Sequence, residues 1–284
     1  MKIGIHQHVF TSLLTRENLG ILDFIRETGF DSVDINVRNT DLEFAKVIRK
    51  RAEKLNLILT GGGSIPKGFE LLSSEKQERI RTVNYMKELV NRVSEIGASL
   101  YHGILYATSG LLTGKAPTET ELKYSVENLQ EVADYASVLG IKLCLEPCNR
   151  YETYVLNTVS DSLDMIAKIN RPNVGLLLDT YHMNIEEKNL YKSLISAGSN
   201  LFHLHVNEND RGIPGTGHIP WDEVFQALKD INYQGIAAVE SFVDDSVDIA
   251  ALVAIWRKLA PSAEILAKES YHFIMNMAQK YGLN

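Results

Sequence analysis

Cysteine is nearly absent from this sequence of 284 residues, which contains only Cys144 and Cys148. Two cysteines do not make a disulfide framework, so a reducing compartment is expected. Their spacing alone is not a zinc motif. The simpler interpretation is one small buried side chain and one loop thiol.

Long apolar runs and an excess of positive charge are also missing. The first residues, MKIGIHQHVF, lack the apolar stretch of a signal peptide, and no run approaches the length that spans a membrane. With 29 basic and 36 acidic residues, the formal net charge is −7, which argues against a nucleic-acid surface. The sequence therefore predicts a soluble cytoplasmic protein with neither a membrane nor a nucleic acid as partner.

No linker or low-complexity segment divides the chain, so residues 1–284 are expected to form one domain. Short β-rich runs alternate with amphipathic helical stretches at a spacing of roughly 25 to 45 residues, the length of a strand-plus-helix unit. Eight such units predict an α/β fold, a single (β/α)8 TIM barrel, with functional loops at the C-terminal ends of its strands. The β-rich runs are KIGIH, DSVDINV, NLILTGG, SLYHGIL, IKLCLE, VGLLLD, LFHLHV and GIAAVES.

Two further features bear on this fold. A doubly wound open sheet is the alternative, but the first strand lacks the glycine fingerprint of a dinucleotide site. The amphipathic stretch at about 261–281 predicts a helix that covers the barrel bottom or joins a subunit interface.

Side-chain alternation predicts one charged or imidazole group facing inward near the end of each of the last four strands. These groups are Glu146, Asp179, His205 and Glu240. The same alternation puts Leu201 and His203 inside and Phe202 outside, with His203 one pleat deeper as a supporting or packing residue.

A single carboxylate at a strand end is more often solvated or a helix cap, but three that converge would repel each other unless a cation neutralised them. The set predicts a divalent metal site with open coordination positions. Oxygen-rich ligation favours Mn²⁺ or Mg²⁺; the imidazole admits Co²⁺ and makes Zn²⁺ less expected.

Four segments, LEPCNRYE, LLLDTYHMNIEE, HLHVNENDRGIPGTGHIPW and AVESF, resemble the ketose 3-epimerases of the xylose-isomerase-like TIM barrel superfamily. That group includes the D-tagatose, D-psicose and L-ribulose 3-epimerases. The resemblance implies the same four metal ligands, and it implies that Glu152, His182 and Arg211 bind a ketose near its carbonyl and first hydroxyls. It also implies a homodimer or homotetramer.

Epimerisation beside a ketone removes a proton from one face of a carbon and returns one to the other face, so two opposed acid–base groups are needed. Glu146 and Glu240 are predicted to be these catalytic residues. The predicted activity is that of an isomerase: metal-dependent epimerisation at C3 of an unphosphorylated ketopentose or ketohexose, through a cis-enediolate. Mn²⁺ is the first choice of metal, with Co²⁺ or Mg²⁺ as alternatives.

The residues that contact the far end of the substrate are less well predicted, because His6 and His8 stand where the family commonly has an aromatic residue. His6 is either a hydroxyl donor or a packed rim residue, and Phe242 is expected to form an apolar wall. After the last strand, SFVDDSVD carries three aspartates that would repel a phosphate, whereas the glycine-rich RGIPGTG keeps phosphorylated substrates open.

Other functions use the same barrel. An aldose–ketose isomerase, or an isomerase acting on hydroxypyruvate or an inosose, would need the same metal site. A metal-dependent apurinic endonuclease is disfavoured, because LTGGGSIP offers no histidine and the net charge is negative. The non-enzyme alternative is a metal-dependent sugar-binding protein. For Arg150, pairing with a carboxylate and simple solvation stay equally open.

Overall fold

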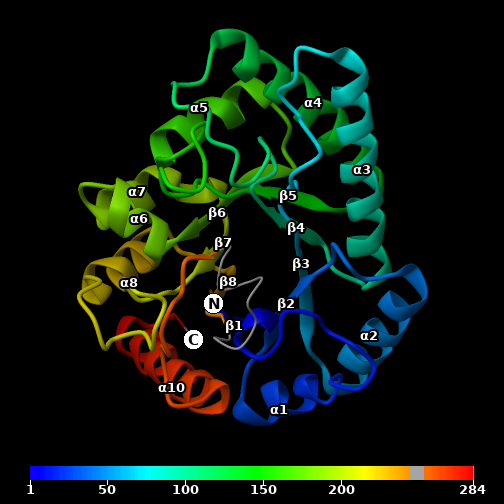
Figure 1. Ribbon diagram of the computed structural model, residues 1–284. Coiled ribbons are helices and arrows are strands. Elements are labelled where there is room, and N and C mark those ends of the chain that lie inside the picture. The colour runs from blue at the N-terminus through cyan, green and yellow to red at the C-terminus, as the bar shows by residue number, and fades with distance from the viewer. Residues whose placement is uncertain (243–252, 284) are drawn as a thin grey trace.

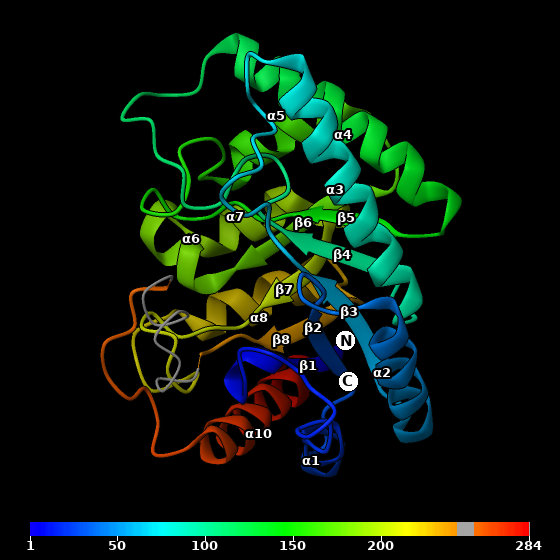
Figure 2. The ribbon, with the colours of Figure 1, turned by 45° about the vertical axis from the view of Figure 1, so that its right-hand side comes forward.

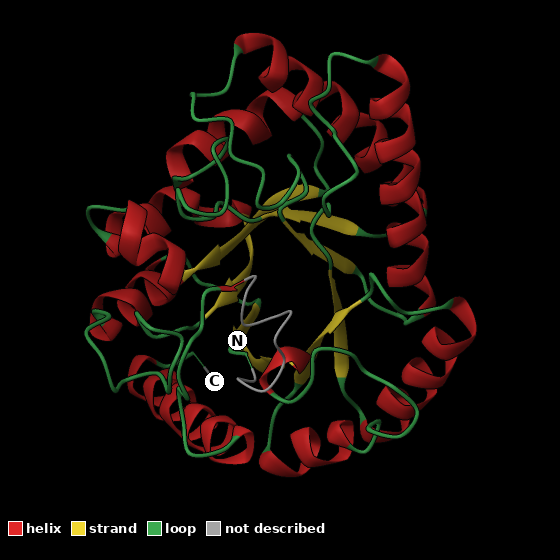
Figure 3. Ribbon diagram, viewed as in Figure 1, coloured by secondary structure: helices red, strands yellow, loops and turns green. Residues whose placement is uncertain are grey.

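Eight parallel strands close into a barrel, which confirms the predicted fold (Figures 1 and 3). This computed structural model describes residues 1–242 and 253–283. The strands pair in chain order, and β8 pairs with β1 to close the barrel. Their bounds are β1 Lys2–His6, β2 Ser32–Asn36, β3 Ile58–Gly62, β4 Leu100–Gly103, β5 Lys142–Leu145, β6 Val174–Asp179, β7 Leu201–His205 and β8 Ile236–Val239.

Helices surround the strands as an outer ring (Figure 1). The last helix, drawn in red, packs against α1, α8 and β1, so the two ends of the chain meet in the ring (Figures 1 and 2). The helices are α1 Ile21–Thr28, α2 Leu42–Leu55, α3 Lys76–Glu95, α4 Glu119–Val138, α5 Val159–Ile169, α6 Thr180–Glu186, α7 Leu190–Ala197, α8 Trp221–Asp230 and α10 Ala263–Tyr281, with 3-10 turns η1 Gln7–Val9 and η2 Gly198–Asn200.

Local sequence sets where several helices begin and end. Thr118 caps α4 in a reciprocal hydrogen-bonded box with Glu121, and Thr158 does the same for α5 with Asp161. Gly29 ends α1 at a φ of 116°, in the left-handed region that favours glycine. Because each capping residue lies within its own strand–helix unit, the local sequence of that unit sets where its helix begins or ends.

One prediction from side-chain alternation is wrong at the start of β7. Leu201 packs in the main core between strands and helices, whereas Phe202 packs inside the barrel against Cys144 and Leu177. The β6–β7 register shifts between Leu176 and Leu177, an irregularity that reverses the in–out order at the start of β7. His203 and His205, beyond the shift, are buried as the alternation predicts.

Within residues 1–242 and 253–283, no helix combines the length and the apolar character that crossing a bilayer requires. Residues 243–248, which include the three aspartates expected to repel a phosphate, lie outside the described part of the chain.

Candidate active site

A cavity of about 170 Å³ lies at the C-terminal ends of the strands. Loops that follow β1, β2, β4, β5 and β8 contribute to its wall, as expected for the functional face of such a barrel. Asp179, fully buried, does not reach the wall. The other predicted site residues all line the cavity: His6, Glu146, Glu152, His182, His205, Arg211, Glu240 and Phe242.

The four predicted metal ligands come together at the base of this cavity. One ligand atom from each of Glu146, Asp179, His205 and Glu240 lies within 4.8 Å of the others. Register explains part of this convergence, because Asp179 and His205 are paired at the ends of β6 and β7. His205 Nδ1 is 3.9 Å from Glu146 Oε1 and 3.6 Å from Glu240 Oε2.

His205 Nδ1 is buried and has no hydrogen-bond partner among the described residues. A buried ring nitrogen without a partner is unusual, and here it faces carboxylate oxygens. One imidazole and three carboxylates are the donors expected for a divalent ion of the Mn²⁺ or Mg²⁺ kind. The residues therefore fit a divalent metal site.

The electrostatics of these groups indicate a shortage of positive charge. Burial, and then repulsion by Glu240, raise the pKa of Glu146 well above its ordinary value. Burial also raises the pKa of Asp179. Burial opposes ionisation of Glu240 as well, but His205 and Arg211 hold the pKa of its carboxyl well below the usual range. A bound divalent cation would allow all three carboxylates to be ionised together.

Asn207, two residues after the end of β7, contacts the carboxylate of Asp179 and the backbone of Glu240. Its Nδ2 donates to Asp179 Oδ1 over 2.9 Å, and its Oδ1 accepts from the backbone N–H of Glu240 over 2.7 Å. Asp179 Oδ1 also accepts from the backbone N–H of Tyr181, whereas Oδ2 accepts from Arg211 Nη2 over the longer distance of 3.4 Å, so Oδ2 is the less engaged oxygen. Sequence analysis missed Asn207, although its place two residues after the inward-facing His205, on the same side of the chain, was a usable signal.

The turn after β5 is held by an ion pair, which answers the question left open for Arg150. Its guanidinium pairs with Glu186 through contacts of 3.0 and 2.8 Å, and Glu186 also accepts from the backbone N–H of Arg150. Inside the same turn, Asn149 Nδ2 donates to Glu152 Oε1 over 3.1 Å. Burial raises the pKa of Glu152, whose carboxyl faces the cavity.

His182 is a buried ring with a hydrogen-bond donor at each nitrogen. The backbone N–H of Asn149 donates to its Nδ1 over 3.2 Å, and Nη2 of Arg211 lies 3.2 Å from its Nε2. That nitrogen points into the site, 3.8 Å from Glu146 Oε1 and 3.7 Å from Asp179 Oδ2. Burial, with Arg211 nearby, keeps the pKa of His182 well below its ordinary value.

Arg211 is a fully charged donor in the same wall. Its guanidinium lies between the rings of Tyr181 and Phe242, 4.2 and 4.9 Å from their centroids. Nη2 donates to Glu240 over 3.2 Å. Nε and Nη1 are buried and have no partner among the described residues, so two donors remain for a ligand. The φ of Arg211 is 62°, a backbone conformation uncommon outside glycine.

The segment that carries Arg211 is folded around a buried carboxylate, Glu208. Its Oε1 accepts from the backbone N–H groups of Asn209 and Ile219, both over 3.1 Å. Its Oε2 accepts from the backbone N–H of Gly215 over 2.8 Å and from Trp221 Nε1 over 3.0 Å. Four donors on one side chain draw the ends of this glycine-rich segment together.

The first prediction tests this arrangement. Burial would raise the pKa of Glu208, but the N–H groups of Ile219 and Asn209 lower it below its ordinary value. A depressed folded-state pKa contributes stability that is present above the unfolded pKa and lost as pH falls through the folded pKa. Glu208→Gln places an amide against these donors, and it should lower the free energy of unfolding by about 1–3 kcal/mol at pH 7. The difference from wild type should shrink below about pH 4.3.

Urea unfolding followed at pH 7 and at pH 4 measures both effects. Glu223→Gln, on the exposed face of α8, is the matched control and should change little at either pH. A difference for Glu208→Gln that is equally large at both pH values would contradict the assignment.

Other polar residues in the cavity wall escaped the sequence analysis: Asn36, Arg38, His102 and Tyr151. His102 is accommodated because its neighbour in the sheet is Gly62, where a Cβ would lie 2.9 Å from the His102 ring. Asn36 on β2 and His102 on β4 could have been found by applying side-chain alternation to the first four strands as well.

On the β1 side of the cavity, the hydrogen bonding of His6 is compatible with the predicted role of hydroxyl donor. Its Nδ1 accepts from the backbone N–H of His8 over 3.0 Å, so the ring proton resides on Nε2. Burial, and then His8, keep the pKa of His6 well below its ordinary value. The Phe242 ring lies 5.5 Å from the His8 ring, tilted by 34°, at the same end of the cavity.

Comparison with known proteins agrees with this architecture. The sequence model of the family described as xylose isomerase-like TIM barrel matches residues 22–269. The ketose 3-epimerase of Arthrobacter globiformis is 34% identical to this chain over 96% of each sequence. A solved L-ribulose 3-epimerase superposes with a TM-score of 0.93 at 30% identity, over 99% of this chain and 95% of the other.

A D-allulose 3-epimerase from Methylomonas sp., solved in complex with D-allulose, gives a TM-score of 0.91 at 29% identity, over 98% of this chain and 97% of that one. The chain belongs to the xylose isomerase-like TIM barrel family, and within it to the ketose 3-epimerases, which are isomerases.

Proposed function

We propose that this protein epimerises an unphosphorylated ketose at C3, with Glu146 and Glu240 as the two acid–base groups. One observation carries the proposal. Glu146, Asp179, His205 and Glu240 follow one another on β5, β6, β7 and β8, so the two glutamates stand at opposite ends of an arc that borders the cavity. A sugar lying over that arc has one glutamate at each side.

Glu146, Asp179, His205 and Glu240 would hold the metal, with Mn²⁺ proposed first and Co²⁺ or Mg²⁺ as alternatives. When bound, the ion supplies electrophilic stabilisation of negative charge that develops on the substrate's oxygens. The fit rests on the unpartnered Nδ1 of His205 and on the three carboxylates around it.

The residues themselves account for the proton movements. One glutamate removes the C3 proton from one face of the ketose, and the other returns a proton to the opposite face, so the configuration inverts. The free Nε and Nη1 donors of Arg211 hydrogen-bond the oxygens on which the enediolate charge develops, and the His182 ring, beside Arg211, contacts the same oxygens. Glu152 accepts a hydrogen bond from a sugar hydroxyl and fixes the orientation of the sugar.

Substrate contacts should separate from metal binding, because Arg211 and His182 lie outside the four-ligand set. We expect Arg211→Ala or His182→Ala to lower kcat/KM by about 10²-fold or more, since each removes a group proposed to contact the developing oxyanion. Metal content should stay near that of wild type. Steady-state kinetics and metal analysis on the same preparations make the measurement.

Arg171→Ala provides the matched control. That arginine pairs with Asp134 between α4 and α5, outside the cavity wall. Its loss should leave the kinetics unchanged. Metal loss in the Arg211 or His182 variants, or kinetics equal to those of wild type, would show that these residues are misassigned.

The substrate is tested with a panel of free ketopentoses and ketohexoses, their phosphates, hydroxypyruvate and an inosose. The metal-reconstituted protein is incubated with each compound, and the products are resolved by chromatography. We expect C3 epimers from at least one free ketose. Aldose products alone would replace the proposal with aldose–ketose isomerisation, and binding of a sugar without turnover would indicate a binding protein.

A further inference from the structure

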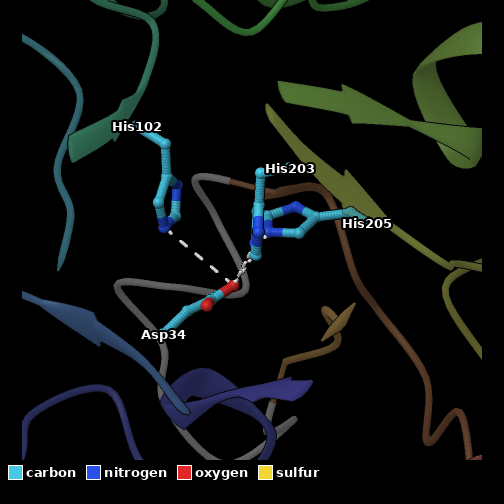
Figure 4. A group of neighbouring side chains, drawn as sticks. All are labelled: Asp34, His102, His203 and His205. Atoms are coloured by element: carbon cyan, nitrogen blue, oxygen red, sulfur yellow. Dashed lines mark hydrogen bonds and ion pairs between the residues drawn. The ribbon is translucent and has the colours of Figure 1, made fainter. Parts of the chain in front are cut away.

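A second cluster of buried polar side chains lies next to the four-ligand set and shares His205 with it (Figure 4). Asp34, on β2, is at its centre and is completely buried. Its Oδ2 is 2.9 Å from His203 Nε2 and 3.1 Å from His205 Nε2, while Thr60 Oγ1 donates to Oδ1. His102 Nε2 is 3.9 Å from the same Oδ2.

These contacts determine where the ring proton of His205 resides. An ionised carboxylate only accepts hydrogen bonds, so both His203 and His205 present Nε2–H to Asp34. A metal binds the neutral imidazole, in which the other nitrogen is then the acceptor. For His205 that nitrogen is Nδ1, the unpartnered atom that faces Glu146 and Glu240.

The contact also restricts the orientation of the ring. Asp34 holds one edge of the imidazole while the opposite edge faces the three carboxylates of the arc. Asp34 in turn is held on its other oxygen by Thr60 and on the same oxygen by His203. A histidine that ligates a metal commonly donates its second N–H to a carboxylate in this way, which fixes the tautomer and raises the basicity of the ligand.

We propose that Asp34 is a positioning residue of the metal site: it selects the His205 tautomer in which Nδ1 is free to bind the metal, and it holds the ring in that orientation. The proposal rests on the metal site of the proposed function. Thr60 and His203 serve it indirectly by keeping Asp34 in place.

The same four side chains allow one alternative interpretation, a second metal site. Asp34, His102, His203 and His205 each offer a ligand atom within 4.8 Å of the others, so they could instead hold an ion of their own. In that case His205 Nε2 would be a ligand and would carry no proton. The two assignments therefore differ in the protonation of one ring nitrogen and in the number of ions bound.

The first experiment measures metal affinity by competition with a chelator. Asp34→Asn keeps the size of the side chain but removes the charge that polarises His205. We expect it to bind Mn²⁺ about 10- to 100-fold more weakly than wild type. Asp31→Asn makes the same change just before β2, where the side chain accepts from the backbone N–H of Ile3 and pairs with Lys2, and it should bind Mn²⁺ like wild type. Affinity of folded Asp34→Asn within about twofold of wild type overturns the proposal.

The second experiment needs no variant and so stands even if Asp34→Asn does not fold. In wild-type protein with ¹⁵N-labelled histidine, loaded with diamagnetic Mg²⁺ or Zn²⁺, the His205 ring should show a protonated, hydrogen-bonded Nε2 and an unprotonated Nδ1. One ion should bind per chain at this site. A proton on Nδ1, or a second ion bound through Nε2, overturns the proposal. Neither readout involves a sugar, so an absence of epimerase activity would count against the proposed function and leave this inference standing.

Discussion

Epimer formed in D₂O is expected to carry deuterium at C3. If Glu146 and Glu240 act from opposite faces, the proton returned to C3 comes from a different group than the one that accepted the first proton. That second group exchanges with solvent before it donates. Product analysed by mass spectrometry and NMR should therefore be labelled at C3 alone.

The two glutamine variants extend this test. Glu146→Gln and Glu240→Gln should each abolish net epimerisation, because inversion needs a base on one face and an acid on the other. One of the variants can still exchange label into C3 of unreacted substrate, since a single remaining glutamate removes and restores a proton on its own face. Glu131→Gln, an exposed glutamate paired with Lys87 on the outer ring, is the matched control and should retain full activity.

Metal content must be measured for each of these variants, because both glutamates are also proposed ligands. Product deuterated only at C1 or C2, with C3 untouched, would reject epimerisation. It would favour transfer along one face by an aldose–ketose isomerase.

Exhaustive removal of divalent metal is expected to abolish activity, and Mn²⁺ or Co²⁺ should restore it. Three carboxylates near one another, two of them buried and the third partly buried, can avoid repulsion only by binding protons or a cation. Binding should also stabilise the fold, by about 2.7 kcal/mol when the free metal concentration is 100 times its Kd. Activity assays and thermal unfolding, with and without added metal, measure both effects.

His205→Ala should weaken metal binding and remove most of this thermal stabilisation. The matched control is His272→Ala, an exposed position on α10, which should behave like wild type. Full activity in a sample verified to be metal-free would rule out the proposed chemistry.

Alternation along single strands was enough to predict the four candidate ligands. Glu146, Asp179, His205 and Glu240 each lie at or just beyond the C-terminal end of a strand, and consecutive parallel strands bring such ends to one rim. The same rule failed for Phe202, because the register shift between β6 and β7 is a property of two paired strands. The sequence of one strand does not determine its register with the neighbouring strand.

The partners of these ligands could not be predicted in the same way. Asp34 and His205 are 171 residues apart and come from strands that are not neighbours in the sheet, so only closure of the barrel brings them within hydrogen-bonding distance. The free donors of Arg211 likewise depend on a loop held by Glu208 and on the rings of Tyr181 and Phe242.

The sequence by itself determined the repeating strand–helix units, their caps and the chemical type of the group at each strand end, because periodicity and capping act over a few residues. The tertiary structure decided which nitrogen of His205 faces the carboxylates, which oxygen of Asp179 is held by Asn207, and which donors of Arg211 remain unpaired. These properties depend on contacts across the barrel interior and between loops, where distance in space is unrelated to distance along the chain.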